Sequence, residues 1–175
     1  MPAKQCFGGN KINAKRLCLL SSLCVLSLGL SYLETLLPTA FIAPGIKLGL
    51  ANAAAVVLIY KKDFKAAVMI SAVRIILSAL LFSGAFSAAF SLAGAAVSLS
   101  LCRVLAKSEK FSVVAVSAAG GAVHNLAQAA VALFTVGKAV IYYLPALIIA
   151  GAVSGAAVGS LSFLILKKLK TNDRK

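Results

Sequence analysis

Acidic residues are scarce in this chain, which has 4 Asp and Glu against 18 Lys and Arg and contains no Trp. With so few carboxylates, the chain has no pair that could hold magnesium. Prenyl and phosphoryl transfer need such a magnesium site. No P-loop and no G-x-S-x-G motif occurs, so ATP hydrolysis and serine catalysis lack candidate residues. We therefore expect that the chain is not an enzyme and holds no cofactor.

Metal ligands are equally sparse, because the chain has one His and 4 Cys. Cys6, Cys18, Cys24 and Cys102 show neither CxxC nor Cys/His spacing. The last three fall in apolar stretches or at the end of one, as small packing residues do. The sequence predicts no metal site and no disulfide.

What the chain has in abundance is apolar surface, with 61% hydrophobic residues and a mean hydropathy of +0.99. One small soluble core could not bury so much, so we expect an integral membrane protein whose solvent is lipid. The net charge of +14 does not indicate nucleic-acid binding, because the basic residues stand at the ends of apolar runs. They suit anionic lipid head groups or an acidic partner.

The basic residues also predict a topology, since all but three of them fall in every second polar gap. The basic gaps are the two tails and the segments near Lys61 and Arg103. The exceptions are Lys47 and Lys138, alone in intervening gaps, and Arg74 within an apolar run. By the positive-inside rule, both termini lie in the cytoplasm of a multi-pass protein of the cell membrane.

Counting apolar runs against about twenty residues per crossing predicts an all-α bundle of six transmembrane helices. The predicted spans are residues 17–37, 46–60, 64–82, 85–106, 112–135 and 140–166. Basic cytoplasmic tails, 1–16 and 167–175, flank this single domain at 17–166. The second span is short and follows Pro44 and Gly45, which favours a helix that begins below the outer surface. Gly151, Gly155 and Gly159 repeat on one face of the sixth span and predict close helix packing.

The polar side chains within the spans carry the functional signal, because lipid makes them costly. Arg74 and Asn52 each lie about 13 Å from the cytoplasmic basic residues of their own spans, at 1.5 Å per residue, so we expect them at one level. A buried Arg needs a partner: either a ligand or a structural neighbour such as Asn52. Glu34, near the outer end of the first span, could bind ligand, reach the interface or pair with Lys47.

The fifth span adds His124, Asn125 and Gln128 within one sector of the helix, at positions i, i+1 and i+4. Gly120 and Gly121 lie one turn below them. A polar cluster above residues without side chains leaves room for a ligand or, equally, for a neighbouring helix.

Five sequence strings resemble one family: LETLLP at 33–38, PGIKLGLANA at 44–53, SAVRIILSALLFSG around Arg74, FSLAGAAVSL at 90–99 and GGAVHNLAQ at 120–128. Together they resemble the Gx transporter family, which is also named heptaprenyl diphosphate synthase component I. The resemblance begins near residue 17 and covers nearly all of the chain.

That family in turn resembles the S components of energy-coupling-factor transporters, six-helix proteins with both termini cytoplasmic. The resemblance implies capture of a small molecule from outside beneath the loop at 38–47, and a coupling subunit with an ATPase pair as partners. The ligand would have an anionic or acceptor-rich head and a flat or apolar, isoprenoid-related body. The implied ligand-facing residues are Glu34, Lys47, Asn52, Arg74, His124, Asn125 and Gln128.

The family's second name implies an alternative, a non-catalytic membrane subunit in isoprenoid or quinone metabolism. In either role, a binding site requires these side chains to face inward and to have open space between them.

Overall fold

A computed structural model describes residues 14–36, 49–135 and 137–172. All regular structure in these ranges is helical, and they contain no strand. The elements are α1 (Ala14–Leu36), the 3-10 turn η2 (Leu50–Asn52), α2 (Ala53–Tyr60), α3 (Phe64–Ser78), the π-helical turn η3 (Ala79–Ser83), α4 (Gly84–Lys107), α5 (Val113–Thr135) and α6 (Val140–Asn172). A helix thus forms within each predicted span. Pro44, Gly45, Lys47 and the loop at 38–47 lie outside the described residues.

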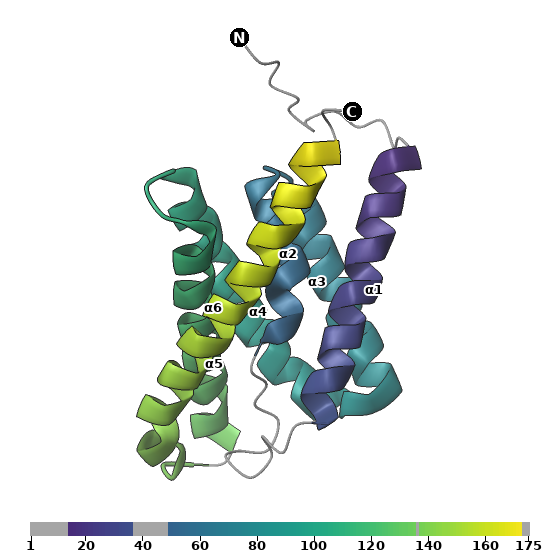
Figure 1. The fold of residues 1–175 in the computed structure, drawn as a ribbon. Coiled ribbons are helices and arrows are strands. Elements are labelled where there is room, and N and C mark those ends of the chain that lie inside the picture. The colour runs from purple at the N-terminus through teal and green to yellow at the C-terminus, as the bar shows by residue number, and fades with distance from the viewer. Residues whose placement is uncertain (1–13, 37–48, 136, 173–175) are drawn as a thin grey trace.

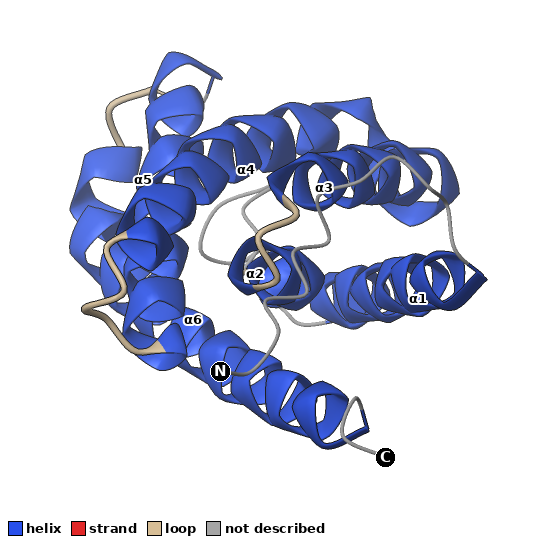
Figure 2. Cartoon of the chain, turned by 90° about the horizontal axis from the view of Figure 1, so that it is seen from above, coloured by secondary structure: helices blue, strands red, loops and turns tan. Residues whose placement is uncertain are grey.

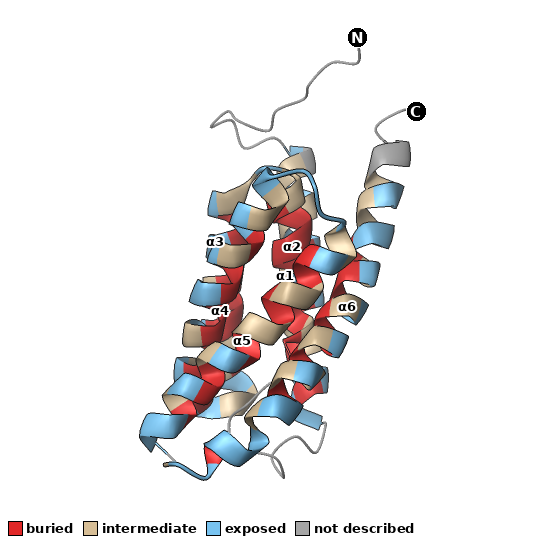
Figure 3. Ribbon diagram, turned by 90° about the vertical axis from the view of Figure 1, so that its left-hand side faces the viewer, coloured by how far each residue is buried: buried red, intermediate tan, exposed pale blue. Residues whose placement is uncertain are grey.

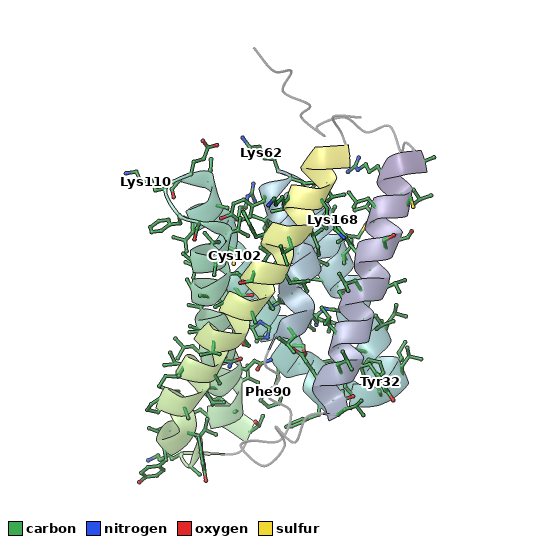
Figure 4. All side chains as sticks on the ribbon, in the orientation of Figure 1. Tyr32, Lys62, Phe90, Cys102, Lys110 and Lys168 are labelled. Carbon is green, nitrogen blue, oxygen red and sulfur yellow. The ribbon has the colours of Figure 1, made fainter. Side chains whose placement is uncertain are left out.

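The helices surround a short central one, α2, which lies inside the ring formed by the others (Figure 2). The first residues of α1 and the last residues of α6 lie at the same end of the bundle (Figure 1). Lys62, Lys110 and Lys168 also lie at this end (Figure 4), which we call the basic end, whereas Tyr32 lies towards the opposite end. Basic residues from three different polar gaps of the sequence therefore gather at one end of the bundle.

Helix α2 is the core of the bundle, because every residue from Ala53 to Ile59 is buried (Figure 3). Its first three residues are alanines, whose small side chains permit close approach by neighbouring helices. Ser162 of α6 donates a hydrogen bond to the Ala53 carbonyl at 3.2 Å. The chain then turns, and Asp63 caps α3 by accepting from the Ala66 N–H at 3.2 Å.

Helices α3 and α4 follow one another without an intervening loop. At η3 and Gly84 the chain turns back, so that α4 runs in the opposite direction to α3. Gly84 has a φ of +73°, in the left-handed region where a residue without Cβ is least strained. This break falls between the predicted spans 64–82 and 85–106. The helix ends differ from prediction: α1 already begins at Ala14, so that it includes Arg16, and α6 continues to Asn172.

Three of the described helical stretches are long and apolar enough to cross a membrane: Arg16–Leu36, Phe64–Lys107 and Val140–Leu169. The second is the reversing α3–α4 stretch. Large apolar side chains such as Leu80, Phe134 and Leu164 project from the bundle surface, which suits contact with lipid. These observations agree with a membrane protein.

Candidate ligand site

Arg74 of α3 points into the bundle and is only 4% exposed. Its guanidinium donates to the Ser31 hydroxyl of α1 at 3.1 Å and to Oδ1 of Asn52 at 3.4 Å. The prediction that Arg74 and Asn52 lie at one level is confirmed by this contact. Buried Arg74 thus ties α1 to the N-terminal end of α2 through hydrogen bonds to neutral oxygens.

His124 of α5 continues the same network. Its Nδ1 lies 3.3 Å from Nδ2 of Asn52 and 3.5 Å from the Ser98 hydroxyl of α4, and its Nε2 lies 3.1 Å from the Gln128 amide. Arg74 fixes the orientation of Asn52, so the amide nitrogen of Asn52 faces Nδ1 of the ring. The Gln128 atom that faces Nε2 of the ring is its amide nitrogen.

Glu34 joins this network from α1. It is 3% exposed, and its Oε1 accepts a hydrogen bond from the Leu50 N–H at the start of η2. Of the three alternatives left open for Glu34, this burial disagrees with reaching out to the interface, while binding of a ligand and pairing with Lys47 stay predictions. Lys47 lies outside the described residues. We call Ser31, Glu34, Asn52, Arg74, Ser98, His124 and Gln128 the Arg74 network.

Two glycines shape the surroundings of the His124 ring. A Cβ at Gly94 of α4 would lie 2.6 Å from Cε1 of His124, so the ring rests directly against the α4 backbone. Gly49, with a φ of +84°, leads the chain into η2 beside the same ring. Sequence reasoning missed Gly94, Ser98 and Ser31. Ser31 could have been found, because it lies one helical turn before Glu34 on the same face.

Asn125 does not join the Arg74 network. Its Nδ2 donates to the Leu147 carbonyl of α6 at 2.8 Å. Beside it, a Cβ at Gly121 would lie 2.1 Å from the Gly151 carbonyl oxygen. Of the two alternatives for the residues around Gly121, a ligand or a neighbouring helix, the structure places a helix there.

The remaining glycines of α6 also contact α5. A Cβ at Gly155 would lie 2.4 Å from the Ser117 carbonyl oxygen, and one at Gly159 would lie 2.7 Å from the Val114 Cα. The structure thus places Gly151, Gly155 and Gly159 in a backbone-to-backbone contact, which we call the glycine interface.

A cavity of about 10 Å³ borders the Arg74 network at Asn52 and Ser98. It extends between α4, α5 and α6 and is also lined by Cys102, Ser117 and Gly155. This volume holds about one water molecule. This cavity has no space of ligand size, so the open space that a binding site requires is not found here in the described arrangement. The described residues also contain no group of three His, Cys, Asp or Glu that could hold a metal ion.

The sequence matches a family model described as heptaprenyl diphosphate synthase component I over residues 23–165. The chain belongs to this family. The match extends from α1 into α6 and includes every residue of the Arg74 network, and the predicted family membership is confirmed. No curated protein and no solved structure matches the chain. The name heptaprenyl diphosphate synthase component I denotes one part of an assembly, which agrees with the prediction that this chain is not itself an enzyme.

Proposed function

We propose that this component I protein is a membrane-embedded binding subunit of a small-molecule uptake system, working like an S component with a coupling subunit and an ATPase pair. The observation that supports this proposal is the Arg74 network itself. It gathers polar side chains from α1, η2, α3, α4 and α5 around one buried guanidinium.

The energetic cost of this network argues for a role beyond packing. An Arg near the membrane midplane costs about 2.5 to 3.5 kcal/mol on insertion scales. Well-packed apolar residues often replace buried charges without loss of stability. Elsewhere the same bundle is held by apolar side chains and by the glycine interface, so stability alone gives little reason to keep Arg74. A ligand with matching polar groups does give one.

In the described arrangement the network side chains are hydrogen-bonded to one another, and the cavity beside Asn52 and Ser98 has room for about one water. A ligand must therefore replace hydrogen bonds such as Arg74 to Ser31 and Asn52 to His124. We propose that this arrangement is the closed, unliganded one, and that ligand enters when α1 and η2 separate from α3 and α5.

The proposed topology has six crossings, with the basic end and both termini in the cytoplasm. It can be tested with single cysteines placed at Lys62, Lys110 or Lys138 in a variant without native cysteines. A membrane-impermeant maleimide applied outside intact cells should label position 138 and leave the other two unlabelled. Labelling at 62 or 110 would contradict this orientation.

Ligand capture can be tested by native mass spectrometry of the protein extracted with its own lipids and small molecules. The wild type should retain a small molecule that Arg74→Met loses. Arg103→Met is the matched control, because Arg103 lies 4.2 Å above the Phe64 ring and outside the network. Equal retention by all three proteins would show that Arg74 does not bind the ligand.

A second candidate function follows from the family description, which names a component of heptaprenyl diphosphate synthase. As an accessory subunit, the chain would bind a soluble prenyl-transferring partner at the membrane. It would then raise diphosphate-dependent chain elongation by that partner in reconstituted vesicles. Uptake that depends on an ATPase pair would favour the transport role instead.

A further inference from the structure

Helix α2 fills only one half of the bundle interior. It begins at Ala53, directly after Asn52 of the Arg74 network, and runs towards the basic end (Figure 1). Its apolar side chains therefore occupy the centre on that side. On the other side of Asn52, none of the described helices takes the central place that α2 holds (Figure 1). We call this side, between Asn52 and the end at which Tyr32 lies, the far half.

Helix α4 lines the far half with hydroxyl groups. It begins at the end opposite the basic end and runs towards it (Figure 1). Ser87, Ser91 and Gly94 share one helical face, because they are four and three residues apart. This face points into the bundle, since Gly94 rests against the His124 ring. At about 1.5 Å per residue, Ser91 lies about 4.5 Å and Ser87 about 10.5 Å beyond Gly94 in the far half.

The hydroxyls of Ser87 and Ser91 are buried but make no hydrogen bond within the described part of the chain. Ser87 is 7% exposed and Ser91 is 3% exposed. Ser98 and Ser100 of the same helix instead donate to carbonyls of their own helix, at 3.4 and 2.8 Å. A buried hydroxyl without a partner is unfavourable, so a ligand that supplied one would be bound more tightly.

Helix α3 adds a third hydroxyl. Ser78 follows Arg74 by four residues on the same buried face, and at about 1.5 Å per residue it lies about 6 Å farther from the basic end. It donates to the Ile75 carbonyl at 3.1 Å, and its oxygen can still accept a hydrogen bond. We call Ser78, Ser87 and Ser91 the far serines. They extend the polar lining of the Arg74 network by about two helical turns.

Close helix packing alone does not explain the far serines. Small side chains let helices approach each other, but α2 uses three alanines, Ala53–Ala55, for this purpose. A hydroxyl at such a position adds the cost of burying a polar group. A ligand in contact with the far serines would compensate that cost through hydrogen bonds.

Building on the proposed binding function, we infer that the far serines extend the ligand site and hydrogen-bond the part of the ligand that lies beyond Arg74. The ligand is then a molecule with hydroxyl, carbonyl or amide groups along its length. An isoprenoid chain in the same place would keep the hydroxyls of Ser87 and Ser91 without partners. This inference replaces the sequence-based expectation of a flat or apolar, isoprenoid-related body.

Native mass spectrometry of the double variant Ser87→Ala/Ser91→Ala tests the inference. Each change removes only a hydroxyl, so the fold should persist, while the fraction of protein that retains its co-extracted molecule should fall at least tenfold. Ser100→Ala is the matched control, because it removes an exposed hydroxyl from the same helix and should leave retention unchanged. If the double variant does not fold, Ser78→Ala makes the same test from α3.

Unchanged retention by these variants, together with loss from Arg74→Met, would overturn the inference and leave the binding function standing. No retained molecule in the wild type would contradict the binding function itself. Farnesyl diphosphate is a direct probe of the ligand body, because its body is an isoprenoid chain. Thermal unfolding followed by circular dichroism should show no stabilisation of the wild type by this probe, and clear stabilisation would overturn the inference.

Discussion

Two faces of α5 show how differently one helix can make contact. Towards α2 and α4 it presents His124 and Gln128, which make side-chain hydrogen bonds in the Arg74 network. Towards α6 it presents Gly121, where backbone lies against backbone. Hydrogen-bonded side chains can exchange partners, whereas a backbone contact without side chains has no alternative packing. The first face is therefore suited to binding and the second to holding the bundle together.

The largest expected effect comes from filling the glycine interface. Gly121→Ala places a methyl group 2.1 Å from the Gly151 carbonyl oxygen, which only movement of α6 can relieve. We expect a loss of about 3 kcal/mol of stability or failure to fold, at the upper end of overpacking effects. Thermal unfolding in detergent, followed by circular dichroism because the chain has no Trp, measures it.

Gly29→Ala is the matched control for this substitution, since a Cβ at Gly29 meets nothing within 4 Å. Its stability should be unchanged or up to about 1 kcal/mol higher, because Ala is the better helix former. Similar losses in the two variants would show that α5 and α6 do not depend on close backbone contact.

Gly94→Ala brings the same methyl group against a side chain instead of a backbone. The His124 ring, 2.6 Å from the new Cβ, can move, so the cost should be smaller, about 1 to 2 kcal/mol. Displacing the ring breaks its bonds to Asn52 and Gln128, so ligand retention in native mass spectrometry should fall sharply. Normal ligand retention by Gly94→Ala would show that the position of the His124 ring does not matter for ligand binding.

The two asparagines allow the sharpest comparison between the faces. Asn125→Leu removes the bond to the Leu147 carbonyl and should cost about 1 kcal/mol while ligand retention persists. Asn52→Leu removes contacts to both Arg74 and His124 and should abolish retention. If Asn125→Leu lost the ligand and Asn52→Leu retained it, the binding site would lie at the α5–α6 contact instead.

The smallest effects are expected at the basic end, outside both regions. Asp63→Asn loses the 2.7 Å ion pair with Arg16 but keeps an oxygen to cap α3, so it should cost under about 1 kcal/mol. Lys62→Gln breaks the exposed 3.6 Å pair with Glu109 and should change stability by no measurable amount. Unfolding at low and high salt checks both, since surface pairs weaken with salt.

Much of this arrangement could be predicted from the sequence, because it follows from one-dimensional spacing. Apolar run lengths indicated the helices, and counting residues from the basic ends put Arg74 level with Asn52. The rotation of α5 could not be obtained in this way. His124 and Asn125 are adjacent in sequence, and only packing against Gly94 and Gly151 decides that one faces the network and the other faces α6.

The positions of Glu34 and Gly94 show the same limit. A carboxylate near a helix end predicts exposure, but η2 supplies an N–H that holds Glu34 inside. Gly94 looked like any small residue of α4 until the His124 ring was placed against it. Such contacts join segments far apart in the chain, so no local pattern contains them.

The short central helix has a consequence for permeability. Together η2 and α2 rise roughly 18 Å, little more than half of the hydrocarbon thickness. Between the Arg74 network and the basic end they place Val57, Leu58 and Ile59, all buried. A molecule bound at Arg74, as proposed above, would therefore face packed apolar side chains between itself and the basic end. The protein alone should conduct neither ions nor solutes, and release on the far side demands displacement of the whole bundle or of α2.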